Sequence, residues 1–105
     1  MLNNYLSVTS NSLKIDKPLP IQKQEALTLF ETLKDKEGFL ALENEVKELM
    51  QFIYTNNELT IDIPVPSRQG SYKKKLDQRE SQNIISIFFE NQTIPEIDNL
   101  YFENW

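Results

Sequence analysis

A short basic stretch is the first part of this sequence that suggests binding chemistry. The chain is acidic overall, with 11 Lys and Arg against 16 Asp and Glu, yet residues 64–79 contain five basic residues and one acidic residue. Such side chains can pair with phosphates or with an acidic protein surface, and Gly70 would allow close backbone approach. The alternative is a solvated loop whose lysines protect the edge of a sheet. The candidate contact residues are Arg68, Tyr72, Lys73, Lys74 and Lys75.

The C-terminal segment is a second candidate contact, because it combines aromatic and acidic residues. From residue 80 onward there are five acidic residues and no Lys or Arg. Tyr101, Phe102 and Trp105 either fold back over the core of the domain, which is the interpretation we favour, or anchor in the groove of a partner protein. In the second case nearby carboxylates would steer the segment toward a basic surface. Those carboxylates belong to Glu96, Asp98 and Glu103.

A cluster of glutamates gives a third surface. Glu43, Glu45 and Glu48 lie close together in the sequence, but on the helix expected there Glu45 points away from Glu43. We interpret them as a solvated helix face rather than a metal site. The same face would be the contact surface if the protein acted as an acidic mimic of nucleic acid.

The composition excludes several kinds of catalytic site. The chain has no Cys and no His, so Cys/His zinc sites, thiol nucleophiles and the Ser-His-Asp arrangement are absent. Two glycines cannot build a glycine-rich phosphate-binding loop. We therefore expect no catalytic residue, no metal site and no cofactor, and a protein that is not an enzyme.

The length and hydropathy pattern predict a single domain. A chain of 105 residues can bury a hydrophobic core without a metal or disulfide. No 18-residue apolar segment and no signal-peptide pattern occur, so we expect a cytoplasmic protein without a membrane contact. We expect one globular domain over residues 1–95, and an acidic and aromatic tail or a final short strand over 96–105.

The N-terminal third predicts a hairpin followed by a helix. Apolar and polar residues alternate over residues 5–17, with turn-forming residues at 10–12, and Pro18 and Pro20 are expected to end the second strand. From Ile21 the apolar spacing becomes helical, and Lys34 and Lys36 suit the end of that helix. The apolar positions of this helix are Ala26, Leu29, Phe30 and Leu33.

Residues 39–53 predict a second, longer helix. Six apolar residues recur at steps of three and four, which is typical of one apolar face over about four turns. This apolar face could pack on the sheet or form the seam of a homodimer. The six residues are Phe39, Leu42, Val46, Leu49, Met50 and Ile53.

The C-terminal half predicts one strand and one further helix. Residues 58–65 alternate strictly, and Pro64 favours an edge strand or a strand that ends there. Residues 66–76 are expected to be a connection. Asp77 and Glu80 have the spacing of a capping box, which favours a helix over 78–91, although residues 83–89 alone could also be a buried strand.

Together these patterns predict an α+β protein, a small single domain in which two to three amphipathic helices pack on a small, mainly antiparallel sheet. We expect a non-enzymatic adaptor, assembly factor or inhibitor that binds another protein through the basic loop and the aromatic C-terminal segment. One alternative is a phage- or plasmid-encoded acidic inhibitor of a nucleic-acid-binding defence enzyme. The other is a direct nucleic-acid binder, which we disfavour because the rest of the chain is strongly acidic.

Overall fold

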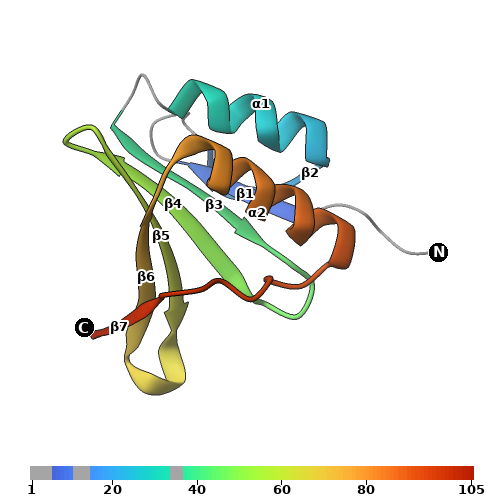
Figure 1. Cartoon of the computed structure of the whole chain (residues 1–105). Coiled ribbons are helices and arrows are strands. Elements are labelled where there is room, and N and C mark those ends of the chain that lie inside the picture. Colours follow the sequence, from blue (N-terminus) through green and yellow to red (C-terminus); the bar gives the residue numbers. More distant parts are fainter. Residues whose placement is uncertain (1–5, 11–14, 34–36) are drawn as a thin grey trace.

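The chain folds into one antiparallel sheet with two helices on one of its faces (Figure 1). The computed structural model describes residues 6–10, 15–33 and 37–105. Within them the sheet has seven strands in the order β2-β1-β3-β4-β5-β6-β7. The elements are β1 (Leu6–Ser10), β2 (Ile15–Ile21), α1 (Lys23–Leu33), β3 (Gly38–Glu43), β4 (Leu49–Thr55), β5 (Glu58–Val65), a 3-10 turn (Pro66–Arg68), β6 (Gly70–Leu76), α2 (Gln78–Asn91) and β7 (Tyr101–Asn104). The protein is thus a compact single domain of the α+β class, as predicted.

The core lies between the helices and the helix-facing side of the sheet. Alternate residues of the central strands point into it, because neighbouring residues of a strand face opposite sides. Phe30 of α1 meets Phe52 of β4 edge to face, with 5.4 Å between ring centroids. The largest fully buried side chains are Phe30, Phe52, Phe88, Leu33, Leu40, Leu42, Met50, Ile61 and Ile85.

The first helix and the N-terminal hairpin were predicted correctly in type. β1 pairs antiparallel with β2, and Ala26, Phe30 and Leu33 of α1 are buried. The expected end of the second strand was wrong, because β2 continues through Pro18 and Pro20. β2 is an edge strand, where a residue without an N–H can be accommodated. The predicted turn at 11–12 and the predicted helix end at 34–36 lie outside the described residues.

The helix predicted over residues 39–53 is wrong. This segment forms two paired strands, β3 and β4, in which Phe39 lies opposite Ile53 and Leu42 lies opposite Met50. Val46, which the helical spacing placed on the apolar face, is 75% exposed in the turn between them. The helical seam suggested for a homodimer is therefore absent from this segment.

Asn44 explains why the chain turns between these two strands. Its side-chain Oδ1 accepts hydrogen bonds from the backbone N–H groups of Val46 and Glu48, at 3.1 and 2.9 Å. Lys47 has a positive φ of 68°, a conformation found in tight turns and not in a helix. These local bonds satisfy the backbone at the turn and override the helical spacing of the apolar residues.

The strand predicted over 58–65 is present as β5, but it is not an edge strand. β5 lies between β4 and β6. Pro64 is tolerated because the pairing with β4 extends only to Asp62, while Pro64 itself lies opposite Ser71 of β6. The proline therefore lies where β5 extends beyond β4.

The predicted connection over 66–76 is also wrong, because most of it is strand β6, paired with β5 on one side and β7 on the other. The helix predicted after it is confirmed as α2, including residues 83–89. Its capping box is present, since Glu80 N–H donates to Asp77 Oδ1 at 2.7 Å and Asp77 N–H donates to Glu80 Oε1 at 3.3 Å. The basic residues before Asp77 thus belong to the sheet, and the helix begins after them.

Candidate functional site

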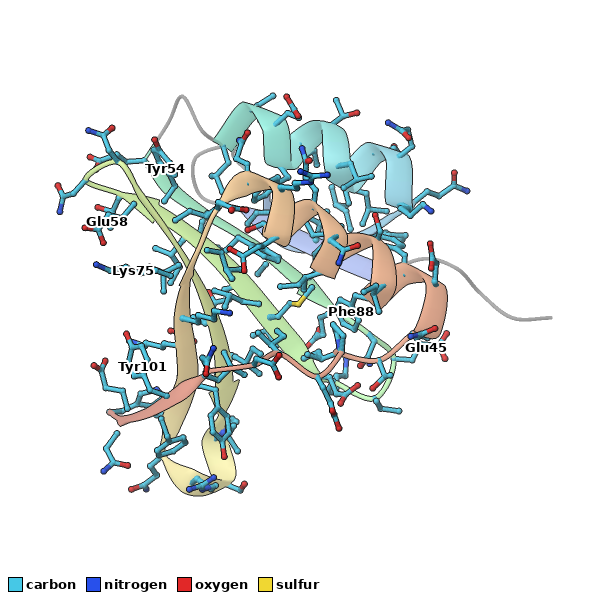
Figure 2. All side chains as sticks on the ribbon, in the orientation of Figure 1. Glu45, Tyr54, Glu58, Lys75, Phe88 and Tyr101 are labelled. Carbon is cyan, nitrogen blue, oxygen red and sulfur yellow. The ribbon has the colours of Figure 1, made fainter. Side chains whose placement is uncertain are left out.

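The three lysines of the basic stretch do not share one surface. Lys74 lies opposite the core residue Ile61 and therefore on the helix-facing side, so Lys73 and Lys75 point to the other side. Each has a carboxylate within ion-pair distance. Lys73 Nζ lies 2.7 Å from Glu103 and 3.7 Å from Asp62, Lys74 Nζ 3.8 Å from Glu80, and Lys75 Nζ 3.0 Å from Glu58, a pair labelled in Figure 2. The three lysines of the basic stretch are thus paired with carboxylates of the chain itself.

Lys73 joins β6 to β7. Its ammonium donates a hydrogen bond to Glu103 Oε1, and this bond is the main reason that the pKa of Lys73 lies above its usual value. Partial desolvation acts in the opposite direction, and the negative charges of Glu103 and Asp62 add to the increase. Lys73 is therefore a charged link inside the fold rather than a free contact for phosphate.

Arg68 and Tyr72 pack with the C-terminal strand. The Arg68 guanidinium lies over the Phe102 ring, 4.2 Å from its centroid, and donates to the hydroxyl of Tyr72. Tyr72 and Phe102 meet edge to face with 5.1 Å between centroids. The sequence predicted these residues in two separate contacts, and the pairing of β6 with β7 brings them together.

Gly70 makes this packing possible. A Cβ atom at this position would lie 2.5 Å from Cζ of Phe102 and 2.6 Å from the backbone oxygen of Glu103. The prediction that Gly70 allows close approach holds in a different sense, because the approaching group is the chain's own C-terminal strand. No other residue type would fit here without moving β7.

Trp105 and Tyr101 remain exposed on the same strand pair. Their relative exposures are 70% and 52%, so the favoured interpretation, in which Tyr101, Phe102 and Trp105 all fold back over the core, is wrong for Tyr101 and Trp105. The Trp105 ring is nevertheless held in place, since its Nε1–H donates to Ser71 Oγ at 3.0 Å and its backbone N–H donates to Gln69 O at 2.9 Å. Figure 2 shows Tyr101 on β7, at the end of the sheet away from the helices. The C-terminal segment therefore docks its backbone and leaves two aromatic rings to solvent.

We refer to this group of side chains as the aromatic edge. It comprises Arg68, Tyr72 and Phe102, where Tyr72 and Phe102 lie opposite each other on the helix-facing side of the sheet, together with Tyr101 and Trp105, which point to the other side. The sequence pointed to all five, but it did not indicate Ser71 and Gln69, which fix Trp105. Their role depends on the register between β6 and β7, and no local pattern of either segment reveals that register.

The glutamates of the alternative acidic face are not on a helix. Glu43 ends β3, and Glu45 and Glu48 lie in the turn before β4 (Figure 2 labels Glu45). Glu48 Oε1 accepts hydrogen bonds from Asn44 Nδ2 at 2.7 Å and from the Thr93 hydroxyl at 2.9 Å. Glu48 is thus part of the turn structure, and the single solvated helix face that the sequence predicted does not exist.

A groove of about 760 Å³ runs between α1 and α2. Gln82 of α2 donates to Glu31 Oε1 of α1 at 2.9 Å. The charged residues that line the groove, Glu31, Arg79 and Glu80, are exposed, so the burial that tunes catalytic groups is missing there. We assign no reaction to this groove.

The described part of the chain offers neither a metal-binding cluster nor a membrane-spanning helix. No three Asp or Glu side chains come together there as potential metal ligands. No helix in the same residues has both the length and the apolar character needed to cross a membrane.

Comparison with known proteins gives no functional information about this chain. No protein-family model, no curated protein and no solved structure matches this chain. Its function is therefore inferred below from the aromatic edge.

Proposed function

We propose that the protein is a non-enzymatic binding protein, acting as an adaptor, assembly factor or inhibitor, and that it contacts another protein through the aromatic edge. The observation that carries this proposal is Trp105, a residue that is 70% exposed and yet held by two hydrogen bonds, one from its ring Nε1–H and one from its backbone N–H. Binding is favoured when a partner removes an exposed aromatic ring from water, because burying its apolar surface lowers the free energy. A cytoplasmic location belongs to the proposal, since the cysteine-free sequence fits a reducing compartment.

The composition of the aromatic edge supports protein binding. Trp, Tyr and Arg are the residues most often found to dominate binding energy at protein interfaces, and the edge contains all three types. The ring of Trp105 is oriented before binding, so less side-chain freedom is lost when a partner covers it. Burying such a ring contributes about 2 kcal/mol or more in a typical interface, equivalent to roughly thirtyfold in affinity.

The two alternatives receive less support. A direct nucleic-acid binder needs free positive charge, and each of the three lysines has a carboxylate of this chain within 4 Å. An acidic mimic of nucleic acid needs a continuous acidic face, and Glu48 is engaged in the β3–β4 turn. We therefore retain protein binding as the proposal.

A pull-down from nuclease-treated lysate of the source cell tests this proposal. The protein would carry an N-terminal tag so that the aromatic edge stays free, and the test variant would combine Tyr101→Ala with Trp105→Ala. Val46→Ala is the matched control, because Val46 is a large exposed apolar residue in the β3–β4 turn. We expect a partner protein that the wild type and the control retain and the double variant loses.

Two results would contradict the proposal. Equal retention of the partner by the double variant would mean that the aromatic edge is not the contact. Retention of nucleic acid alone, before nuclease treatment, would favour direct nucleic-acid binding. Reversing the three lysines is a poorer test, because it would also break ion pairs that hold β5, β6, β7 and α2 together.

A further inference from the structure

The two edges of the sheet differ in how they could accept another strand. Both β2 and β7 are edge strands. β2 contains Pro18 and Pro20, which have no N–H to donate, and prolines are a common protection against strand addition. β7 has no Pro and no Lys, and its register with β6 runs without a bulge over its four residues. The edge at β7 therefore lacks these protective features.

The register shows which backbone groups of β7 face outward. The N–H of Trp105 donates to Gln69 O, so it points toward the β6 side. Backbone groups of successive residues in a strand point to opposite edges, so Tyr101 and Glu103 also face β6. The N–H and C=O groups of Phe102 and Asn104 therefore point away from the sheet, where an added strand could pair with them.

Charge decides what kind of strand fits this edge. The segment from residue 90 to residue 105 has four acidic residues and no basic residue. Glu96 and Asp98, in the segment leading to β7, are exposed and have no ion-pair partner among the described residues. A second copy of this chain would bring the same acidic segment and a further net charge of −5 to the contact. A segment carrying Lys or Arg would instead be attracted.

We infer that β7 accepts an extended Lys- or Arg-bearing segment of a partner protein as an added strand of the sheet. This inference rests on the proposed function and specifies its mode of binding. Main-chain hydrogen bonds to Phe102 and Asn104 supply the pairing. Tyr101 and Trp105 lie on the same side of the strand and pack against alternate side chains of the added segment, while Glu96 and Asp98 attract its basic residues.

The backbone pairing is tested with the variant Asn104→Pro. Proline removes an outward N–H without removing a bond to β6, and Asn104→Ala is the matched control because it keeps that N–H. The probe is a library of random 12-residue peptides displayed on phage, selected against the whole protein. Binding of each enriched peptide is then measured with the free peptide, from the emission of Trp105, which is the single tryptophan of the chain.

We expect enriched peptides with a net positive charge and few prolines. Their affinity should fall about tenfold or more with Asn104→Pro, and stay within about twofold of the wild type with Asn104→Ala. The neutral pair Glu96→Gln with Asp98→Asn should weaken binding severalfold. The matched pair Glu43→Gln with Glu45→Gln, in and near the β3–β4 turn, should not.

Four outcomes would overturn this inference. The first two are that no peptide binds, or that the enriched peptides carry no net positive charge. The third is that Asn104→Pro and Asn104→Ala bind the peptides equally well. The fourth is that light scattering shows a homodimer that Asn104→Pro dissociates. If natural partner retention requires Trp105 but tolerates Asn104→Pro, the proposed function stands and strand addition is wrong. If neither change affects retention, both are wrong.

Discussion

Replacing Gly70 with alanine tests whether β7 is seated on β6 as described. The new Cβ would lie 2.6 Å from the backbone oxygen of Glu103, which cannot rotate away as a side chain can. β7 must therefore shift or detach, and the Phe102 ring must leave its place. This movement would break an aromatic pair, worth about 0.5–1.5 kcal/mol, and a cation–π interaction, worth about 0.5–1 kcal/mol.

The expected destabilisation of Gly70→Ala is thus roughly 1–2.5 kcal/mol, which lowers the melting temperature by about 4–10 °C in a domain of this size. Urea unfolding and calorimetry measure it. Hydrogen exchange of the Trp105 backbone amide, which donates to Gln69 O, should also become faster. Lys75→Ala is the control, since it removes only an exposed ion pair, worth about 0–1 kcal/mol.

A change in stability opposite to the expected destabilisation would be the clearest contradiction. At a position that tolerates a side chain, replacing glycine with alanine usually stabilises a protein by about 0.4–1 kcal/mol, because the unfolded chain loses conformational freedom. A Gly70→Ala protein that is equally stable or more stable, with unchanged exchange at Trp105, would mean that β7 is not docked over Gly70.

Two further predictions concern the rest of the fold. Met50→Ala should destabilise by about 2–5 kcal/mol because Met50 is fully buried, whereas Val46→Ala should change the unfolding free energy by less than about 0.5 kcal/mol. A helix over residues 39–53 would bury both side chains, so comparable destabilisation by the two variants in urea titrations would contradict the two strands. Hydrogen bonds from the Asn56 backbone N–H and the Thr55 hydroxyl lower the pKa of Glu37 below its usual 4.5 in the folded protein. The ionised Glu37 carboxylate therefore stabilises the fold above pH 4.5, and this stabilisation is lost as the pH falls through the lowered pKa of the folded state. Glu37→Gln should reduce this acid dependence, seen as a smaller drop in the urea midpoint below pH 4.5, and an unchanged pH profile would contradict the assignment.

The elements that were predicted correctly carry their own local signals. The helix α2 is indicated by Asp77 and Glu80, whose capping box depends only on residues three apart. The strand β5 shows strict alternation, and α1 has apolar residues at helical spacing with Ala26, Phe30 and Leu33 buried. In each case the local pattern and the tertiary structure agree.

The segment over residues 39–53 was predicted wrongly because its two strands are both rich in apolar residues. The helical pattern left out Leu40 and Phe52, which are fully buried, and included Val46, which is exposed. Any dense apolar sequence contains some residues three and four apart, so the spacing alone does not separate a helix from two buried strands. Asn44 favours a turn locally, and the hydrogen bonds that it accepts from the backbone N–H groups of Val46 and Glu48 show that it stabilises one here.

The sequence predicted which residues belong to the candidate site, but not that they lie together in the fold. The sequence indicated Arg68 and Tyr72 in one contact and Phe102 in another, and the structure joins them through strand pairing between segments about thirty residues apart. The basic stretch was predicted as a connection because the capping box at Asp77 places the helix start after it, whereas the carboxylates that pair with Lys73, those of Asp62 and Glu103, come from other strands. A strand rich in lysine is stable here since those carboxylates lie beside it.

The central claim is that the aromatic edge is the surface on which a partner protein binds. Photo-crosslinking in the source cell tests it most directly, with a benzophenone amino acid placed at Tyr101 in one protein and at Val46 in another, because both positions are exposed. We expect a crosslink to one protein from position 101, lost when Trp105→Ala is added, and none from position 46. Equal crosslinking from both positions, or a crosslink at 101 that persists without Trp105, would contradict the claim.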